Sequence, residues 1–223
     1  MKKIIVSLLV GLTVSANVFA ISISPKIIEA KLVNQEVFKE IRVKNDTNTP
    51  KRYKVSIIKP INIGSDDYYI GNHIEFYPPI LNLKPNDTKS IKLLIEDFKD
   101  LQDGEYRCYL SLDEITPSNA KGISIRINLN SAIYANKGKL NKSLEINDFK
   151  INDTHVQGVI ENKGNTSLKI IARYLMDDGT TVDHEFFIGR KGNHDLKYNG
   201  KNKVVQVDLL DRDTKKHIKT LKI

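Results

Sequence analysis

The chain has very little of what stabilises or identifies many exported proteins. It has one cysteine, Cys108, and no tryptophan, so no disulfide can form within the chain. Cys108 shares a predicted strand face with Tyr106 and Leu110, which favours a buried cysteine acting as a small hydrophobe. A reactive thiol is the alternative. A domain without disulfides must be held by its hydrophobic core alone.

Long apolar runs are also missing beyond the first twenty residues. Lys2 and Lys3 precede an apolar stretch from Ile4 to Val14, and small residues lead to Ala20. This pattern is typical of a secretory signal peptide cleaved after Ala20, and the stretch is too short to span a membrane. We therefore expect residues 1–20 to be removed, and the rest to be exported without membrane insertion.

The sequence lacks the patterns that catalysis, metals or nucleic acids require. No nucleophile elbow and no phosphate-binding glycine loop is present, and the histidines have no metal-ligand spacing, at His73, His155, His184, His194 and His217. The net charge of +8 is not clustered with aromatic residues. We therefore predict a non-enzyme without cofactor or metal, which does not bind nucleic acid.

What the chain does contain is alternation with a period of two. Short segments with apolar residues at every second position recur every 8–15 residues or so, separated by turn residues such as Pro85-Asn86-Asp87, which is typical of antiparallel sandwiches. We predict an all-β protein of two immunoglobulin-like sandwiches, one over residues 21–134 and a smaller one over 144–223. The polar, lysine-rich stretch 135–143 is the predicted linker.

Two segments of the first domain carry more specific signals. The stretch QDGEYRCYL, residues 102–110, has the spacing of an immunoglobulin tyrosine corner, although Cys108 has no partner cysteine for the disulfide. The stretch 123–129 has strict aliphatic alternation at Ile123, Ile125, Ile127 and Leu129. As a central strand this would be ordinary core. As the last strand of its domain it favours an exposed edge, which would suit pairing with another chain.

In order and spacing, these segments resemble the periplasmic chaperones of the chaperone–usher pilus pathway, and their alternate branch in particular. The segments that carry the resemblance are SISPKIIEA, RVKNDTNTPKRYKVSI, YPPILNLKPNDTKSIKLL, GEYRCYLSLDEI and ISIRINLNSAIY in the first domain, and VIENKGNTSLKI in the second.

The resemblance implies an L-shaped, two-domain chaperone in the periplasm that binds fimbrial or pilus subunits and delivers them to an outer-membrane usher. The aliphatic residues Ile123, Ile125, Ile127 and Leu129 would complete the subunit's sandwich by donor-strand complementation, without ATP or a metal. The strand Ile21–Ser24 would hold the other side of the cleft. Tyr106 would pack the corner, with Asp103 and Gly104 forming its turn.

One departure concerns the subunit's C-terminal carboxylate, which the better-known branch of this family binds with an arginine and a lysine. The alignment places Ile27 and Ala132 at these positions, and neither can bind a carboxylate. Lys26 and Arg126 are the candidate replacements, with Lys137 and Lys139 as further ones.

Other classes of function also stay open. An exported two-domain adhesin or envelope scaffold would keep residues 123–129 in its interior, and a periplasmic enzyme with sandwich domains would need a polar site that the sequence does not show. The sequence also leaves open whether the free chain covers its exposed strand by self-association.

Overall fold

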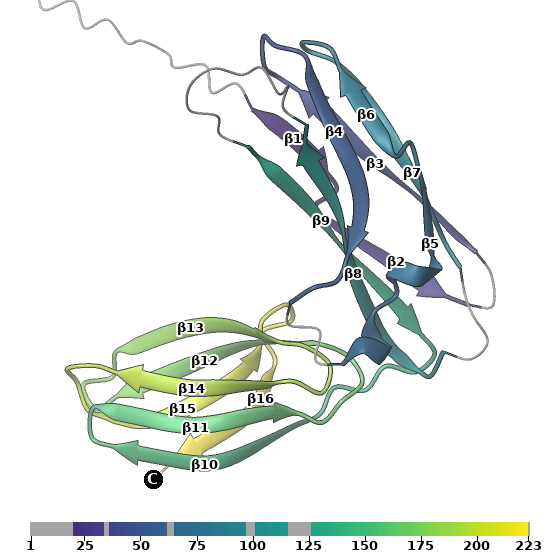
Figure 1. The fold of residues 1–223 in the computed structure, drawn as a ribbon. Coiled ribbons are helices and arrows are strands. Elements are labelled where there is room, and N and C mark those ends of the chain that lie inside the picture. Colours follow the sequence, from purple (N-terminus) through teal and green to yellow (C-terminus); the bar gives the residue numbers. More distant parts are fainter. Residues whose placement is uncertain (1–19, 34–35, 62–64, 97–100, 116–125, 223) are drawn as a thin grey trace, which may run out of the picture.

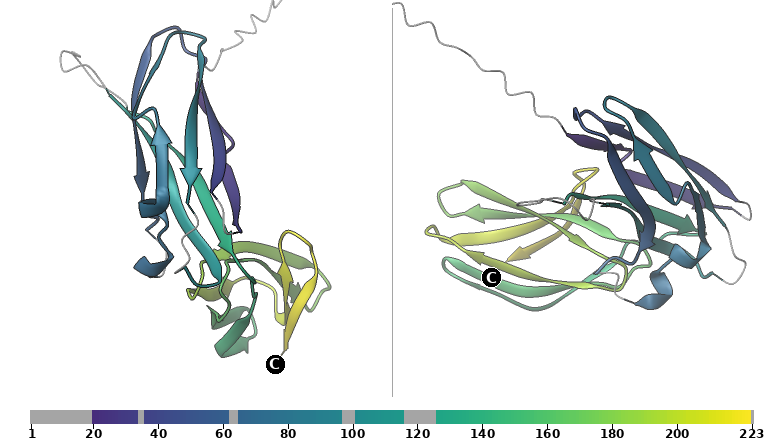
Figure 2. Two further views of the ribbon diagram at one scale, coloured as in Figure 1. Left: turned by 90° about the vertical axis from the view of Figure 1, so that its right-hand side faces the viewer. Right: turned by 45° about the horizontal axis from the view of Figure 1, so that its top comes forward.

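The chain folds into two β-sandwich domains in the computed structural model. The structure describes residues 20–33, 36–61, 65–96, 101–115 and 126–222. The long axes of the two domains meet at an angle and leave a concave side between them (Figures 1 and 2). The predicted all-β, two-domain fold is confirmed.

The first domain packs a four-stranded sheet, of order β1-β3-β7-β5, against a five-stranded sheet, of order β2-β9-β8-β4-β6. Two short 3-10 turns, Asp66–Tyr68 and Gly71–His73, precede β5. The strands are β1 (Ile21–Ser24), β2 (Ile27–Leu32), β3 (Val37–Asn45), β4 (Lys51–Ile58), β5 (Ile74–Tyr77), β6 (Ile80–Leu83), β7 (Thr88–Ile95), β8 (Gly104–Glu114) and β9 (Asn128–Lys137).

The N-terminal segment changes sheets at Pro25. Before this proline, β1 pairs antiparallel with β3 in one sheet, and after it β2 pairs parallel with β9 in the other. Proline cannot donate a backbone hydrogen bond, which suits a break between two pairings. Ser131 Oγ donates a hydrogen bond to the Pro25 carbonyl at 2.8 Å and so fixes the crossing point to β9.

The core of the first domain lies between the two sheets and explains how it does without a disulfide. Ile41, Ile91, Leu110 and Ile133 are fully buried, and Cys108 is 1% exposed among them. Burial raises the pKa of the Cys108 thiol to about 12, so the neutral thiol packs as a small apolar side chain.

The second domain is a smaller sandwich of sheets β10-β11-β14 and β13-β12-β15-β16. Its strands are β10 (Leu144–Asn152), β11 (His155–Asn162), β12 (Leu168–Met176), β13 (Thr181–Ile188), β14 (Asn193–Asn199), β15 (Val204–Asp211) and β16 (His217–Lys222). Because β9 continues to Lys137, the stretch between the domains begins three residues later than the linker that the sequence predicted.

A buried carboxylate joins the two domains. Glu105, near the start of β8, is 7% exposed and accepts hydrogen bonds from the hydroxyls of Thr166 and Ser167 and from the Ser167 backbone N–H. Its own backbone N–H donates to the Asn165 carbonyl at 2.8 Å. The loop between β11 and β12 is therefore fixed to the base of β8.

Two buried arginines reinforce this junction reciprocally. Arg107 of the first domain lies over the ring of Phe187, with 4.7 Å between the guanidinium carbon and the ring centre. Arg190 of the second domain lies over Tyr68 at 4.1 Å and Tyr106 at 5.2 Å. Each domain thus provides an arginine that lies on aromatic rings of the other.

Asp103 and Gly104, which the sequence predicted to form the turn of the tyrosine corner, also contact the second domain. Gly104 has a φ of +148°, and a Cβ on it would lie 2.5 Å from Arg190 Nη1. Arg190 and Asn165 both donate to the Asp103 carbonyl, at 3.4 and 3.1 Å. Only glycine at position 104 leaves room for the second domain to approach this closely.

Cys108 should be inert in the native protein. Alkylation by iodoacetamide at pH 8 should be at least about a hundredfold slower than in the unfolded chain, because neither thiolate nor access is available. Mass spectrometry with and without guanidinium measures this. Native alkylation at the rate of the unfolded protein would show that Cys108 is not buried.

The Glu105→Ala substitution should lower the free energy of unfolding by about 2–4 kcal/mol, because it leaves three buried donors without an acceptor. Thermal unfolding should also separate into two transitions as the domains uncouple. Glu29→Ala is the matched control, an exposed carboxylate beside the same junction, and should change the stability by less than about 0.5 kcal/mol. Equal effects of the two substitutions would contradict this role of Glu105.

Candidate functional site

Strand β9 has a strand partner on both sides along only part of its length. Strand β8 pairs with it from Asn128 to Lys137, whereas β2 joins its other side only from Ala132 onward. The sequence predicted residues 123–129 as either ordinary core or an exposed edge strand, the last strand of the first domain. In fact β2 forms the edge of this sheet, and β9 is open only in the part before Ala132.

The backbone of this open part points toward the unoccupied side. The Ala132 N–H donates to the Lys26 carbonyl, away from β8. Because backbone groups alternate along a strand, those of Asn130 and Asn128 point the same way, and no described strand pairs with them there. We call this stretch, residues 128–131, the open edge. Strand β1, at the edge of the opposite sheet, lies near it.

The side chains on one face of β9 pass gradually out of the core. Ile133 is fully buried, Leu129 is half-buried against the core, and Ile127 is 46% exposed. Ile127 precedes the strand, and its backbone N–H lies 3.4 Å from a Glu114 carboxylate oxygen. One aliphatic face therefore serves the domain's own core at one end and is exposed at the other.

Of the four aliphatic residues singled out in the sequence, the structure places two. Leu129 of β9 lies on the same face as Ile133, as alternation predicted. Ile127 precedes the strand, and Ile123 and Ile125 lie outside the described residues. Strand β9 begins at Asn128, so Asn128 and Leu129 are the described residues of the predicted segment 123–129 that belong to it.

The two positions at which the resemblance led us to expect carboxylate-binding residues are direct neighbours. Ile27 of β2 pairs with Ala132 of β9, at the end of the open edge. Lys26 and Arg126 are both exposed near this edge, one at each end of it. Lys139 lies beyond β9, where its backbone N–H donates to Asp103 Oδ2 at 3.0 Å. Lys137 lies at the far end of β9 from the open edge.

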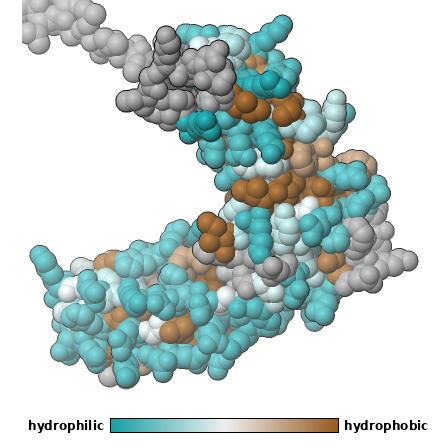
Figure 3. All heavy atoms as spheres, in the orientation of Figure 1, coloured by the Kyte–Doolittle hydropathy of each residue, from teal (hydrophilic) through white to brown (hydrophobic). Residues whose placement is uncertain are grey.

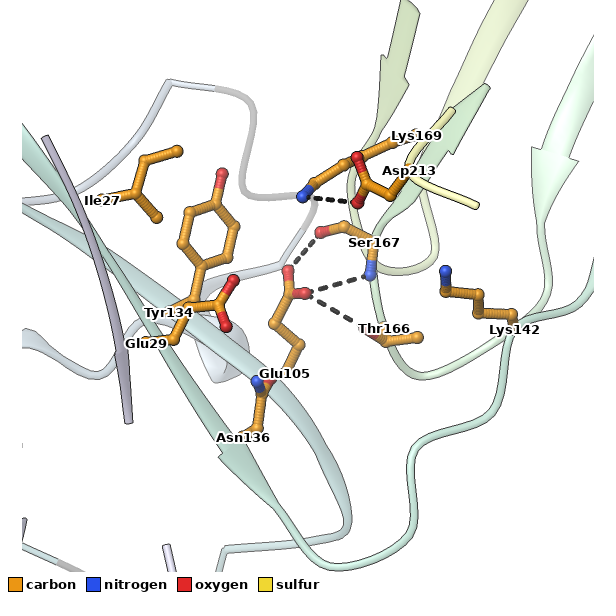
Figure 4. Close-up of a pocket in the computed structure, with 10 residues that line it drawn as sticks. All are labelled: Ile27, Glu29, Glu105, Tyr134, Asn136, Lys142, Thr166, Ser167, Lys169 and Asp213. Carbon is orange, nitrogen blue, oxygen red and sulfur yellow. Dashed lines mark hydrogen bonds and ion pairs between the residues drawn. The ribbon is translucent and has the colours of Figure 1, made fainter. Parts of the chain in front are cut away.

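The angle between the domains holds a cavity of about 150 Å³ (Figure 4). From the first domain, Ile27, Glu29, Tyr134, Asn136 and Glu105 line it. From the second domain and its approach come Lys142, Thr166, Ser167, Lys169 and Asp213. Both domains thus line the cavity, and Ile27, which pairs with Ala132 at the end of the open edge, is one of the lining residues.

Two lysines line this cavity, each paired with an aspartate, and neither was predicted from the sequence. Lys169 Nζ lies 2.9 Å from Asp213 Oδ2, and Lys142 Nζ lies 2.7 Å from Asp211 Oδ2, which holds the Asp211 pKa well below its usual range. No spacing in the sequence connects these second-domain residues with Ile27, because only the docking of the domains brings them together.

The corner residue Tyr106 is 3% exposed, and its hydroxyl donates to the Gln102 carbonyl at 2.8 Å. It thus forms the tyrosine-corner contact within the first domain and receives Arg190 on its ring.

No family model and no curated protein matches the sequence, but many solved structures match the fold. The class 5 fimbriae chaperone CfaA superposes with a TM-score of 0.59 at 17% identity, over 91% of this chain and 97% of that one. The SafB chaperone, solved in complex with the Salmonella enterica SafA pilin, gives 0.58 at 12%, over 94% and 98%.

A third structure, the chaperone–tip adhesin pre-assembly complex CsuC–CsuE of Acinetobacter baumannii, gives 0.57 at 12%, over 92% and 98%. At these identities the likeness establishes the fold. The chain has the complete two-domain fold of the chaperones of chaperone–usher fimbriae.

The residues that the structure describes include no helix long and apolar enough to cross a bilayer. They also include no group of three His, Cys, Asp or Glu side chains placed to hold a metal ion.

The exposed end of the aliphatic face should contribute little to the stability of the free protein. Ile133→Ala should lower the free energy of unfolding by about 2–5 kcal/mol, because it opens a cavity in a packed core. Ile127→Ala should lower it by less than about 1 kcal/mol, since this side chain is already half-exposed. Urea unfolding measures both, and an equal loss for Ile127→Ala would place that residue in the core.

Proposed function

We propose that the protein is a periplasmic chaperone that binds fimbrial or pilus subunits by strand donation and delivers them to an outer-membrane usher. The observation that carries this proposal is the open edge of β9, next to an aliphatic face that emerges from the core at Ile127. The likeness to chaperones solved with a pilin and with a tip-adhesin subunit supports it.

The mechanism follows from what an incomplete sandwich requires. A subunit that lacks one strand exposes both unpaired backbone groups and an open apolar groove. The open edge supplies the backbone partners, and the aliphatic face fills the groove, with Leu129 and Ile127 followed by the predicted Ile125 and Ile123. Each buried aliphatic side chain contributes about 1.5–3 kcal/mol before ordering costs are deducted.

No energy source is needed in this scheme. The subunit is held by contacts that another subunit's strand can replace, so release follows from exchange at the usher. Export to the periplasm rests on the predicted signal peptide with cleavage after Ala20, and chaperones of this fold act in that compartment. No step requires a catalytic group, a cofactor or a metal.

The carboxylate of the subunit's C-terminus would bind near the open edge. Lys26 and Arg126 stay the candidates for this role, because both are exposed and close to residues that flank the open edge. Lys169 is an additional candidate, because it lines the same cavity as Ile27, where it pairs with Asp213.

Co-purification tests the proposal. The wild-type chain, expressed in a periplasm together with the fimbrial subunits of its own genome, should capture at least one of them. The double variant Ile125→Asp, Ile127→Asp should stay folded and lose this subunit, since two charges would have to enter an apolar groove.

Phe38→Asp is the control. Phe38 is 72% exposed on β3 of the other sheet, so this variant should bind as the wild type does. If the double variant unfolds, residues 125 and 127 belong to the core and the adhesin or scaffold alternative is favoured. If the folded double variant still binds, strand donation by this segment is wrong.

A further inference from the structure

One row of outward side chains on the first domain is apolar. The pairings Ile27–Ala132, Ala132–Tyr109 and Tyr109–Ile58 place these four side chains next to one another on the same face of the sheet. Ile27 is 54% and Ile58 37% exposed, and the two between them are partly buried. We call these four residues the outer row.

The rows on either side of the outer row are polar. On one side the paired residues are Asn130, Ser111 and Ser56. On the other side, Tyr134 lies between Glu29 and Arg107. Hydrophobic residues gather in a band on the first domain where it overlooks the second (Figure 3). Of these three paired rows, only the outer row consists entirely of aliphatic and aromatic residues.

The geometry of the open edge directs a bound chain toward the outer row. A strand that pairs with β9 at residues 128–131 cannot continue along the sheet, because β2 occupies that line from Ile27 onward. It cannot turn inward either, since Ile28 and Ile133 are 3% and 0% exposed in the packed core. The outer face, beside Ile27 and Ala132, is open to its end or its continuation.

We propose that the outer row binds an apolar side chain of the client subunit, from the residues that adjoin the strand paired with β9. This inference rests on the proposed function and adds a selection rule to it. A client with a charged side chain at this point would lose solvation without gaining an opposite charge within the row. In the adjoining row, the Arg107 guanidinium already lies between the rings of Tyr134 and Phe187.

Site-specific photocross-linking tests where the client lies. A benzophenone amino acid replaces Ile27 or Ile58 in the full-length chain, and Phe38 in the control, and each is co-expressed with the subunit that the wild type captures. The two outer-row positions should cross-link to the subunit next to its paired strand, and position 38 should not. Cross-links between two copies of this chain, or none to the subunit, would overturn the proposal.

Affinity measurements test what the row recognises. Ile27→Ser and Ile58→Ser should each weaken binding of that subunit by about tenfold, because one apolar contact is lost in each. Ile27→Val and Ile58→Val keep the contact and should bind within about threefold of the wild type. All four changes are at exposed positions, and circular dichroism checks that the variants fold.

The outcomes separate this inference from the proposed function. If the Ile125→Asp, Ile127→Asp variant loses the subunit while both serine variants bind within twofold of the wild type, strand donation stands and the outer row has no role. If the wild type captures no subunit, both proposals are wrong. If only one serine variant fails to fold, the other serine variant and the cross-links still show whether the outer row contacts the subunit.

Discussion

The half-paired strand β9 is the feature on which the rest of this structure depends. Sheets normally protect their open edges, because unpaired backbone groups recruit other chains. Here the break at Pro25 takes β1 to the opposite sheet and lets β2 cover β9 only from Ala132. The aliphatic face of β9 is thus divided between the domain's own core, at Ile133, and the solvent, at Ile127. This division leaves the unpaired part of β9 open for the strand donation that we propose.

The junction between the domains determines what surrounds that edge. Glu105 is a buried carboxylate whose hydrogen-bond donors come from the other domain, so its burial is favourable only when the domains are docked. Arg107 and Arg190 add cation–π contacts in both directions. The second domain is therefore held at a fixed angle, and its Lys169 lines the same cavity as Ile27 of β2, together with Lys142 from the approach to this domain (Figure 4).

Much of the fold could be predicted from local patterns, while the partners of each strand could not. Alternation correctly assigned Cys108 and Leu110 to the core, because side-chain direction along a strand depends only on the neighbouring residues. Which strand lies beside β9, and from which residue, depends on Ile27 meeting Ala132 across the whole domain. The buried cluster at Glu105 was missed for the same reason, since Thr166 and Ser167 have no special spacing relative to it.

Amide hydrogen exchange at the open edge tests the central claim most directly. In the free protein the N–H groups of Asn128 and Asn130 should exchange rapidly, at rates close to those of an unstructured peptide, while that of Ile133 should be strongly protected. In the complex with a captured subunit, Asn128 and Asn130 should become protected by at least about a hundredfold, because they then lie between two strands. Strong protection of both amides in the free protein, or no change on binding, would contradict the account.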